Sequence, residues 1–109
     1  MNVSQHDLAK NYLAQKEQLL NDSLTLTQTL MDNLGDREKT TDLLRKRKAL
    51  LTQLEQLDQS FSHSLADYAF DEADLYQLGL LAEKLWLLDD QITKAMQQNK
   101  AQILQSLNH

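Results

Sequence analysis

Residues 75–88, LYQLGLLAEKLWLL, carry more apolar surface than one core contact can use. With a turn of about 100° per residue, this stretch and the residues that follow it to the C-terminus form a helix with two apolar faces. Tyr76, Leu80 and Leu87 lie on one face, with Trp86 at its border. A helix that is apolar on both sides is usually buried on both sides. We expect the other face to form a core; it carries Leu78, Leu81, Ala82, Leu85, Leu88, Ile92, Met96, Ile103 and Leu107.

The composition predicts an all-α protein. Leucine supplies 24 of the 109 residues, proline is absent, and glycine occurs only at positions 35 and 79. Leu, Gln, Lys, Glu and Ala lose little rotamer freedom in a helix, whereas Pro and Gly interrupt one. Strands need runs of β-branched residues in alternation, and the chain has only two Ile and one Val.

The first helix is expected over residues 4–34. Ser4 is a suitable N-cap, and Gly35 suits the left-handed position that follows many helices. Two lines of apolar residues run along this helix, about 100–140° apart on the helical wheel, so the helix is broad enough to touch two neighbours. One line is Leu13, Leu20, Leu24 and Met31, and the other is Leu8, Tyr12, Leu19, Leu26 and Leu30.

The second helix is expected over residues 37–69, with Asp36, Thr40 or Thr41 as its cap. Its apolar residues repeat at spacings of three, four and seven, as in a coiled-coil seam. The serine-rich segment Ser60–Ser64 weakens helix propensity, and a break there would give four helices instead of three. The seam residues are Leu43, Leu50, Leu54, Leu57, Phe61, Leu65 and Tyr68.

The third helix is expected over residues 72–107, with capping residues in the segment Asp71–Asp74. Gly79 inside it predicts a close approach of another backbone or a local kink. Short connections make consecutive helices antiparallel neighbours. The length suits one domain, so residues 1–109 are expected to form an elongated antiparallel three-helix bundle.

Six of the eleven basic residues lie between Arg37 and Lys48. Consecutive residues point in different directions around a helix, so a solvated helix surface is favoured over a phosphate or acidic-partner site. Arg47 differs, because it lies on the apolar seam, and Asp89 lies on the core face of the third helix. We predict a semi-buried Arg47–Asp89 ion pair that fixes the helix register; the alternative is that Arg47 extends to water.

Catalytic and metal sites are not expected. His6, His63 and His109 are scattered and match no metal-ligand spacing, and the acidic residues near position 72 are better explained as helix caps than as calcium ligands. No cofactor is expected. Arg47 alone hints at a small helical enzyme of the chorismate-mutase kind, but the other charged residues of such a site do not converge on the seams, so we expect no enzyme activity.

The net charge of −5 is unevenly spread, with 3 basic and 9 acidic residues in positions 55–109. This balance argues against a general nucleic-acid binder. No apolar stretch approaches the ~20 residues that span a bilayer, and no signal peptide is recognisable. We therefore expect a cytoplasmic protein that is not inserted in a membrane.

Tyr76, Leu80, Trp86 and Leu87 have two interpretations. They form either a further core contact, covered by the broad first helix, or a groove that binds an amphipathic helix of another protein. Tyr and Trp suit the second use, because they supply a large contact area at low entropy cost. A homodimer would cover the same residues.

The segment of residues 41–57, TDLLRKRKALLTQLEQL, resembles the middle helix of flagellar export chaperones of the FliT and FlgN kind, which have charged residues followed by spaced leucines. The segment from Leu88 to Leu107 is similar to their last helix. The resemblance implies a bacterial cytoplasmic chaperone that holds a helix of a filament-cap or hook-associated protein until export. The alternative is a self-associating coiled-coil protein with a structural role.

Overall fold

The computed structural model describes the backbone of residues 4–107 and the side chains of residues 4–100. It is an all-α bundle of three helices, α1 (Gln5–Asp32), α2 (Arg37–Ser62) and α3 (Glu72–Leu107). The molecule is elongated, with principal extents of 69 × 24 × 19 Å. The predicted fold class and the number of helices are confirmed. Ile103, Leu107 and His109 lie outside the described side chains.

The helix starts follow the predicted caps. Ser4 Oγ accepts a hydrogen bond from the Asp7 amide at 3.2 Å, and Asp36 Oδ1 accepts one from the Lys39 amide at 3.1 Å. Asp71 Oδ1 accepts one from the Ala73 amide at the start of α3. Each carboxylate or hydroxyl satisfies an amide that the first helical turn leaves without a partner, which fixes where the helices begin.

The prediction for Gly35 is wrong, because neither glycine has a positive φ angle. Helix α1 ends two residues earlier than predicted, and Asn33, with φ −119° and ψ 17°, is its C-cap. The side-chain amide of Asn33 donates a hydrogen bond to the Thr29 carbonyl. The backbone carbonyl of Asn33 accepts a hydrogen bond from Thr40 Oγ1 at 2.7 Å. Asn33 therefore closes the α1–α2 turn without a left-handed residue.

Helix α2 ends at Ser62 and not at residue 69 as predicted. Ser60 and Ser62 donate their hydroxyl hydrogens to the carbonyls of Gln56 and Gln59, and such bonds compete with continued helix. The structure shows no fourth helix within residues 4–107. Leu65, in the turn that follows α2, is nevertheless buried, so the predicted apolar seam continues past the end of the helix.

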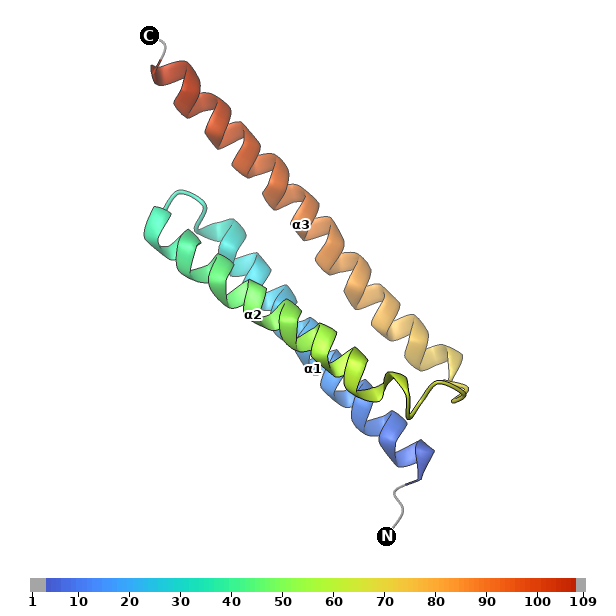
Figure 1. Cartoon of the computed structure of the whole chain (residues 1–109). Helices are drawn as coiled ribbons and strands as arrows, with labels where there is room; N and C mark the ends of the chain where they lie inside the picture. The colour runs from blue at the N-terminus through green and yellow to red at the C-terminus, as the bar shows by residue number, and fades with distance from the viewer. Residues whose placement is uncertain (1–3, 108–109) are drawn as a thin grey trace.

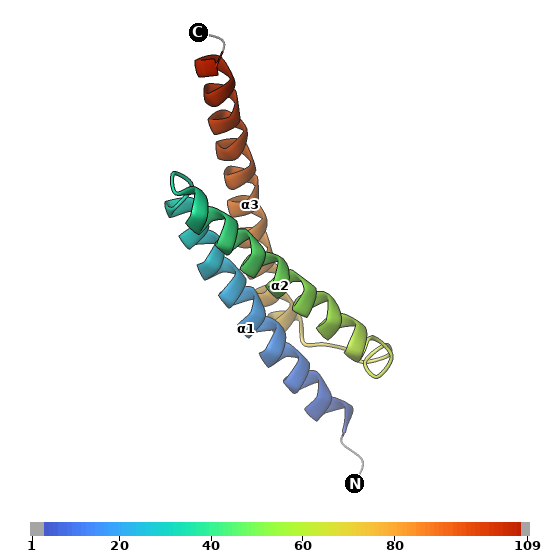
Figure 2. The ribbon, with the colours of Figure 1, turned by 60° about the vertical axis from the view of Figure 1, so that its left-hand side comes forward.

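Helix α1 is the centre of the bundle. It packs against both α2 and α3, whereas α2 and α3 make no close backbone contact along the described residues. Figures 1 and 2 show α3 standing apart from α2, with its C-terminal end extending beyond the α1–α2 turn. The most deeply buried side chains of α1 lie between its two predicted apolar lines, and they include Ser23 and Thr27, both 0% exposed. Small side chains at this position let α1 approach its neighbours closely.

Candidate functional site: an apolar surface on α3

Helix α3 exposes large apolar side chains. Tyr76 is 67% exposed, Trp86 is 66% exposed and Leu87 is 47% exposed. Leu80 is half-buried, and Leu75 and Met96 add to the exposed apolar surface. The structure thus places three of the four predicted partner-binding residues at the surface, and nothing else in the described chain covers them.

The exposure follows from the position of α3 at the side of the bundle. Leu85 and Ile92, 8% and 5% exposed, face α1 and belong to the core. Tyr76 and Leu87 lie about 160–180° around the helix from Leu85, where α3 has no neighbour within the described residues. One apolar face of α3 is therefore used for folding, and the other remains open.

Gly79 does not mark a close helix contact, and the predicted approach of another backbone is absent. A Cβ atom built on Gly79 meets no atom within 4 Å. The helix runs without interruption from Glu72 to Leu107, so the residue does not end or divide α3 either. Gly79 instead leaves open space on the exposed side of α3.

Arg47 and Asp89 connect α2 to α3. Arg47 Nη2 lies 2.5 Å from Asp89 Oδ2, and the two side chains are 25% and 29% exposed. The pair connects two helices that make no close backbone contact with each other, so both side chains reach across the gap. Arg47 Nε is buried and has no hydrogen-bond partner among the described residues.

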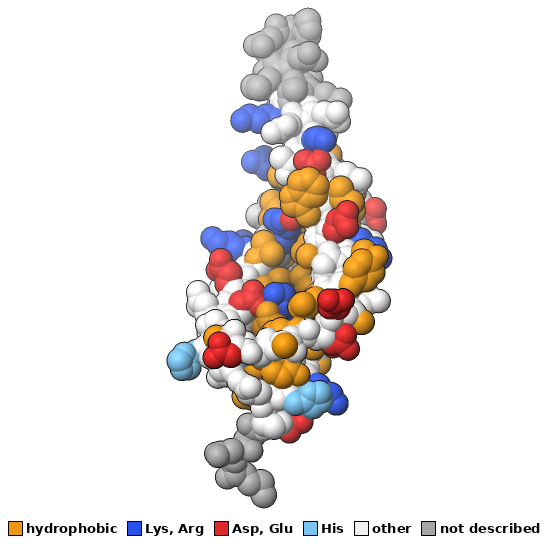
Figure 3. All heavy atoms as spheres, turned by 90° about the vertical axis from the view of Figure 1, so that its right-hand side faces the viewer, with side chains coloured by type: hydrophobic (Ala, Val, Ile, Leu, Met, Phe, Trp, Pro, Cys, Tyr) orange, Lys and Arg blue, Asp and Glu red, His pale blue; other side chains and the backbone are white. Residues whose placement is uncertain are grey.

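The surface between α2 and α3 is hollowed (Figure 3), and we call this hollow the α2–α3 groove; the Arg47–Asp89 pair crosses it about halfway along. Arg47 marks the side of α2 that faces α3, and Asp89 marks the side of α3 that faces α2. Helical periodicity places Leu44 and Leu51 on the α2 wall of this groove, and Leu75 and Trp86 on the α3 wall. Figure 3, seen from the side of α3, shows hydrophobic side chains gathered around a hollow on this face.

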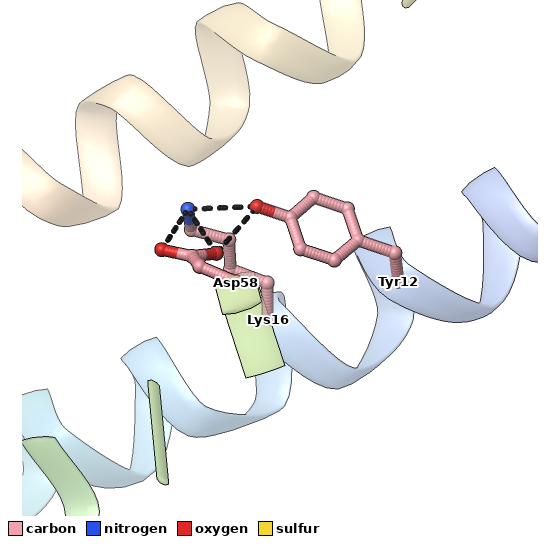
Figure 4. A network of polar contacts seen from close by, with 3 residues as sticks. All are labelled: Tyr12, Lys16 and Asp58. Carbon is pink, nitrogen blue, oxygen red and sulfur yellow. Dashed lines mark hydrogen bonds and ion pairs between the residues drawn. The ribbon is translucent and has the colours of Figure 1, made fainter. Parts of the chain in front are cut away.

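A polar network links α1 to α2 near the other end of the bundle. Tyr12 Oη donates to Asp58 Oδ1 at 2.6 Å, and Lys16 Nζ donates to Tyr12 Oη at 3.0 Å and to Asp58 Oδ1 at 3.1 Å. Figure 4 shows Tyr12 and Lys16, both from α1, meeting the Asp58 carboxylate. Lys16 and Asp58 thus neutralise each other's charge where α1 meets α2, with side chains that are 25% and 49% exposed.

The same network changes the acidity of two of its members. Burial and the hydrogen bond to Asp58 raise the pKa of Tyr12 above its ordinary value. Burial alone would lower the pKa of Lys16, but its hydrogen bonds and charge interactions with Tyr12 and Asp58 outweigh burial and raise it. Both groups therefore hold their protons more firmly in the folded protein.

An aromatic cluster lies beside this network, at the end of the bundle that carries the loop between α2 and α3. The ring of Tyr12 lies 5.5 Å from that of Phe61 and 6.0 Å from that of Phe70, and Tyr68 meets Phe70 edge-on at 5.0 Å. A cavity of about 240 Å³ opens here, lined by Tyr12, Asp58, Phe61, Ser62, Leu65 and Phe70. The cluster anchors the loop between α2 and α3 against α1, and so sets the direction in which α3 leaves the loop.

The basic run on α2 is mostly solvated. Arg45, Lys46 and Lys48 are exposed, and Lys46 pairs with Asp42 on the same helix at 3.1 Å. Among the described residues no group of three or more His, Cys, Asp or Glu is arranged to hold a metal ion. Nor does any helix over these residues have the length and apolar character needed to cross a bilayer.

Comparisons of this chain with protein-family models, curated protein sequences and solved structures give no match.

Sequence reasoning missed the Tyr12–Lys16–Asp58 network and the buried pair Ser23 and Thr27. Lys16 carried one available signal, because it lies within the apolar stripe of the first helix, one turn after Tyr12. A lysine in that position needs an acceptor nearby. Ser23 and Thr27 gave no comparable signal, since both residue types are mostly exposed in proteins.

Proposed function

We propose that this protein binds an amphipathic helix of another protein. More concretely, we propose a cytoplasmic export chaperone that holds a helix of a flagellar or secreted substrate. The observation that carries the proposal is the exposure of Tyr76, Trp86 and Leu87 on a helix whose opposite face already forms the core. Large aromatic side chains of this kind dominate the binding energy of protein interfaces.

The arrangement of the helices supports helix binding over other protein-binding modes. The chain offers no sheet edge along residues 4–107, so strand addition has no template. The exposed apolar side chains instead follow one helix, α3, at spacings that suit the spaced anchors of an amphipathic helix. The resemblance of residues 41–57 to flagellar export chaperones supplies the more specific part of the proposal.

The test uses the helical end segments of filament-cap and hook-associated proteins from the same organism, with binding measured by calorimetry. We expect the wild-type chain to bind one of these segments in a one-to-one complex. Trp86→Ala and Leu87→Asp should each weaken binding by about tenfold or more, because each removes an apolar anchor. Both residues are exposed, so both variants should melt within a few degrees of the wild type.

Matched controls separate the surface from the fold. Thr52→Ala changes an exposed residue of α2 and should affect neither binding nor melting temperature. Loss of folding in Leu87→Asp would assign this face to the core. A dimer in the wild type that dissociates in Leu87→Asp, together with no binding to any segment, would favour the self-associating structural protein instead.

A further inference from the structure

The charged residues beside the α2–α3 groove change sign along its length. On the α2 side, Arg37 lies next to the α1–α2 turn, Lys48 lies near the middle of the helix, and Glu55 lies closer to the loop that leads to α3. All three lie about 80–100° around α2 from Arg47, on one edge of the groove. Arg37, Lys48 and Glu55 are exposed and form no ion pair among the described residues. This side is thus positive along the half nearer the α1–α2 turn and negative along the half nearer the loop.

The α3 side shows the same order. Glu72 lies at the loop end of α3 and Lys100 lies towards the turn end, and both are exposed. Glu72 and Lys100 lie on the part of the helix that carries Trp86, within about 40° of that residue. The loop adds the exposed carboxylates Asp67 and Asp71. Both sides of the groove are therefore negative at the loop end and positive at the turn end.

We infer that the α2–α3 groove receives one partner helix in a single direction. The occupant is an amphipathic helix with acidic residues in its N-terminal half and basic residues in its C-terminal half, and it runs antiparallel to α3. Its acidic half then lies beside Arg37, Lys48 and Lys100, and its basic half lies beside Glu55 and Glu72. This inference rests on the proposed function and adds the chemistry and direction of the partner.

The direction agrees with the usual charge bias of helices. Acidic residues are favoured near helix N-termini and basic residues near C-termini, because they oppose the helix dipole. A helix with this common bias meets favourable charges along both sides of the groove only when it runs antiparallel to α3. Complementary charges of this kind select the partner and its orientation.

The length of the groove sets the length of the probe. From Thr41 to Ser62 the α2 wall rises about 30 Å, which corresponds to a helix of about 20 residues. The probes are two synthetic peptides of that length with the same Leu stripe and the same composition, without Trp or Tyr. One has Glu in its N-terminal half and Lys in its C-terminal half, and the other has the reverse order.

Trp86 reports binding, because it is the only tryptophan of the chain and is 66% exposed. A helix in the groove should bury it and shift its fluorescence to shorter wavelength. We expect the Glu-first peptide to bind about tenfold tighter than the Lys-first peptide at low salt. The difference should shrink at about 0.5 M salt, where screening is strong.

A charge-exchanged protein controls for the greater intrinsic helicity of the Glu-first peptide. The variant Arg37→Glu, Lys48→Glu, Glu55→Lys and Glu72→Lys reverses four exposed charges and keeps the net charge of the chain. It should prefer the Lys-first peptide, an inversion that peptide helicity cannot produce. Circular dichroism checks that the variant is folded. If it is not folded, the single exchange Lys48→Glu replaces it, and this exchange should reduce the preference for the Glu-first peptide.

Disulfide trapping tests the direction itself, because the chain has no cysteine of its own. A Glu-first peptide with an N-terminal cysteine should cross-link to Thr41→Cys about tenfold faster than to Ser62→Cys. Preferential cross-linking to Ser62→Cys, or equal binding of both peptides, would overturn the inference and leave helix binding intact. No shift of Trp86 emission with either peptide, or a protein dimer that already buries Trp86, would overturn both proposals.

Discussion

Arg47 and Asp89 are the two residues whose contact depends most on how α2 and α3 are aligned. The guanidinium and the carboxylate meet at 2.5 Å although the two helices do not pack on each other. A shift of α3 by one turn would move Asp89 by about 5.4 Å and would leave two partly buried charges unpaired. The pair therefore penalises other alignments of α3 along α1.

The first prediction is that the two residues are energetically coupled. Arg47→Met and Asp89→Leu should each lower the free energy of unfolding by about 1–3 kcal/mol, because each leaves the opposite charge without its partner. The double variant should be more stable than the sum of the two losses implies, since no unpaired charge remains. Urea unfolding of the four proteins measures the coupling, and strictly additive losses would contradict it.

Single residues also show how far the sequence can be interpreted. Arg47 is a charged residue that interrupts the apolar seam of α2, and Asp89 interrupts the core face of α3 in the same way. Their opposite charges made it possible to predict that the two residues form a pair. The Tyr12–Lys16–Asp58 network could not be found in this way, because Asp58 lies outside the predicted seam of α2. Its contact with α1 depends on the rotation of α2, which spacing alone does not determine.

At the scale of elements, local chemistry determined the helix starts and tertiary structure determined the ends. Ser4 and Asp36 cap helices through bonds to amides three residues away, a pattern that can be recognised in the sequence. The end of α2 depends instead on competition between continued helix and the packing of Leu65 and Phe70 around Tyr12. That competition involves residues far apart in the chain. The sequence therefore indicated that helix propensity is weak at Ser60–Ser64, but not the residue at which α2 ends.

Helix α3 provides the second prediction. Gly79 lies in the helix with nothing within 4 Å of a built Cβ atom, so its extra backbone freedom serves no packing contact within the chain. Gly79→Ala should raise the free energy of unfolding by about 0.5–1 kcal/mol. Ala82→Gly, at an exposed position of the same helix, is the matched control and should lower it by a similar amount. A loss of stability in Gly79→Ala, measured by chemical unfolding, would mean that the backbone at this position is distorted.

For the whole molecule, the arrangement of three helices explains why so much apolar surface is left. Two helices packed on a central one can bury their inner faces only, and the gap between α2 and α3 exposes part of their sides as well. The sequence predicted the surplus on α3, because Tyr76 and Leu87 lie opposite the core face of the same helix. It did not predict the α2–α3 groove, since a compact three-helix bundle would have closed it.

The stability of the whole molecule should fall at alkaline pH, which is the third prediction. The pKa of Tyr12 and that of Lys16 are both raised in the folded protein above their ordinary values of 10.0 and 10.5. The unfolded chain therefore loses these protons first, and above about pH 10 it binds fewer protons than the native state. Because the free energy of unfolding follows this difference in bound protons, it decreases as the pH rises through the raised values.

Below about pH 9 both groups are protonated in both states, so their contribution is complete and constant there. Urea unfolding followed by far-ultraviolet circular dichroism, at a series of pH values from about 8 to about 11, measures the decrease. Asp58→Asn is the control, because it keeps the shape of the side chain and removes the carboxylate that favours both protonated groups. The variant should be less stable than the wild type at pH 8 and should lose less stability on going to pH 11. An equal loss in both proteins would mean that the decrease arises from the other lysines and tyrosines and not from the contact between α1 and α2.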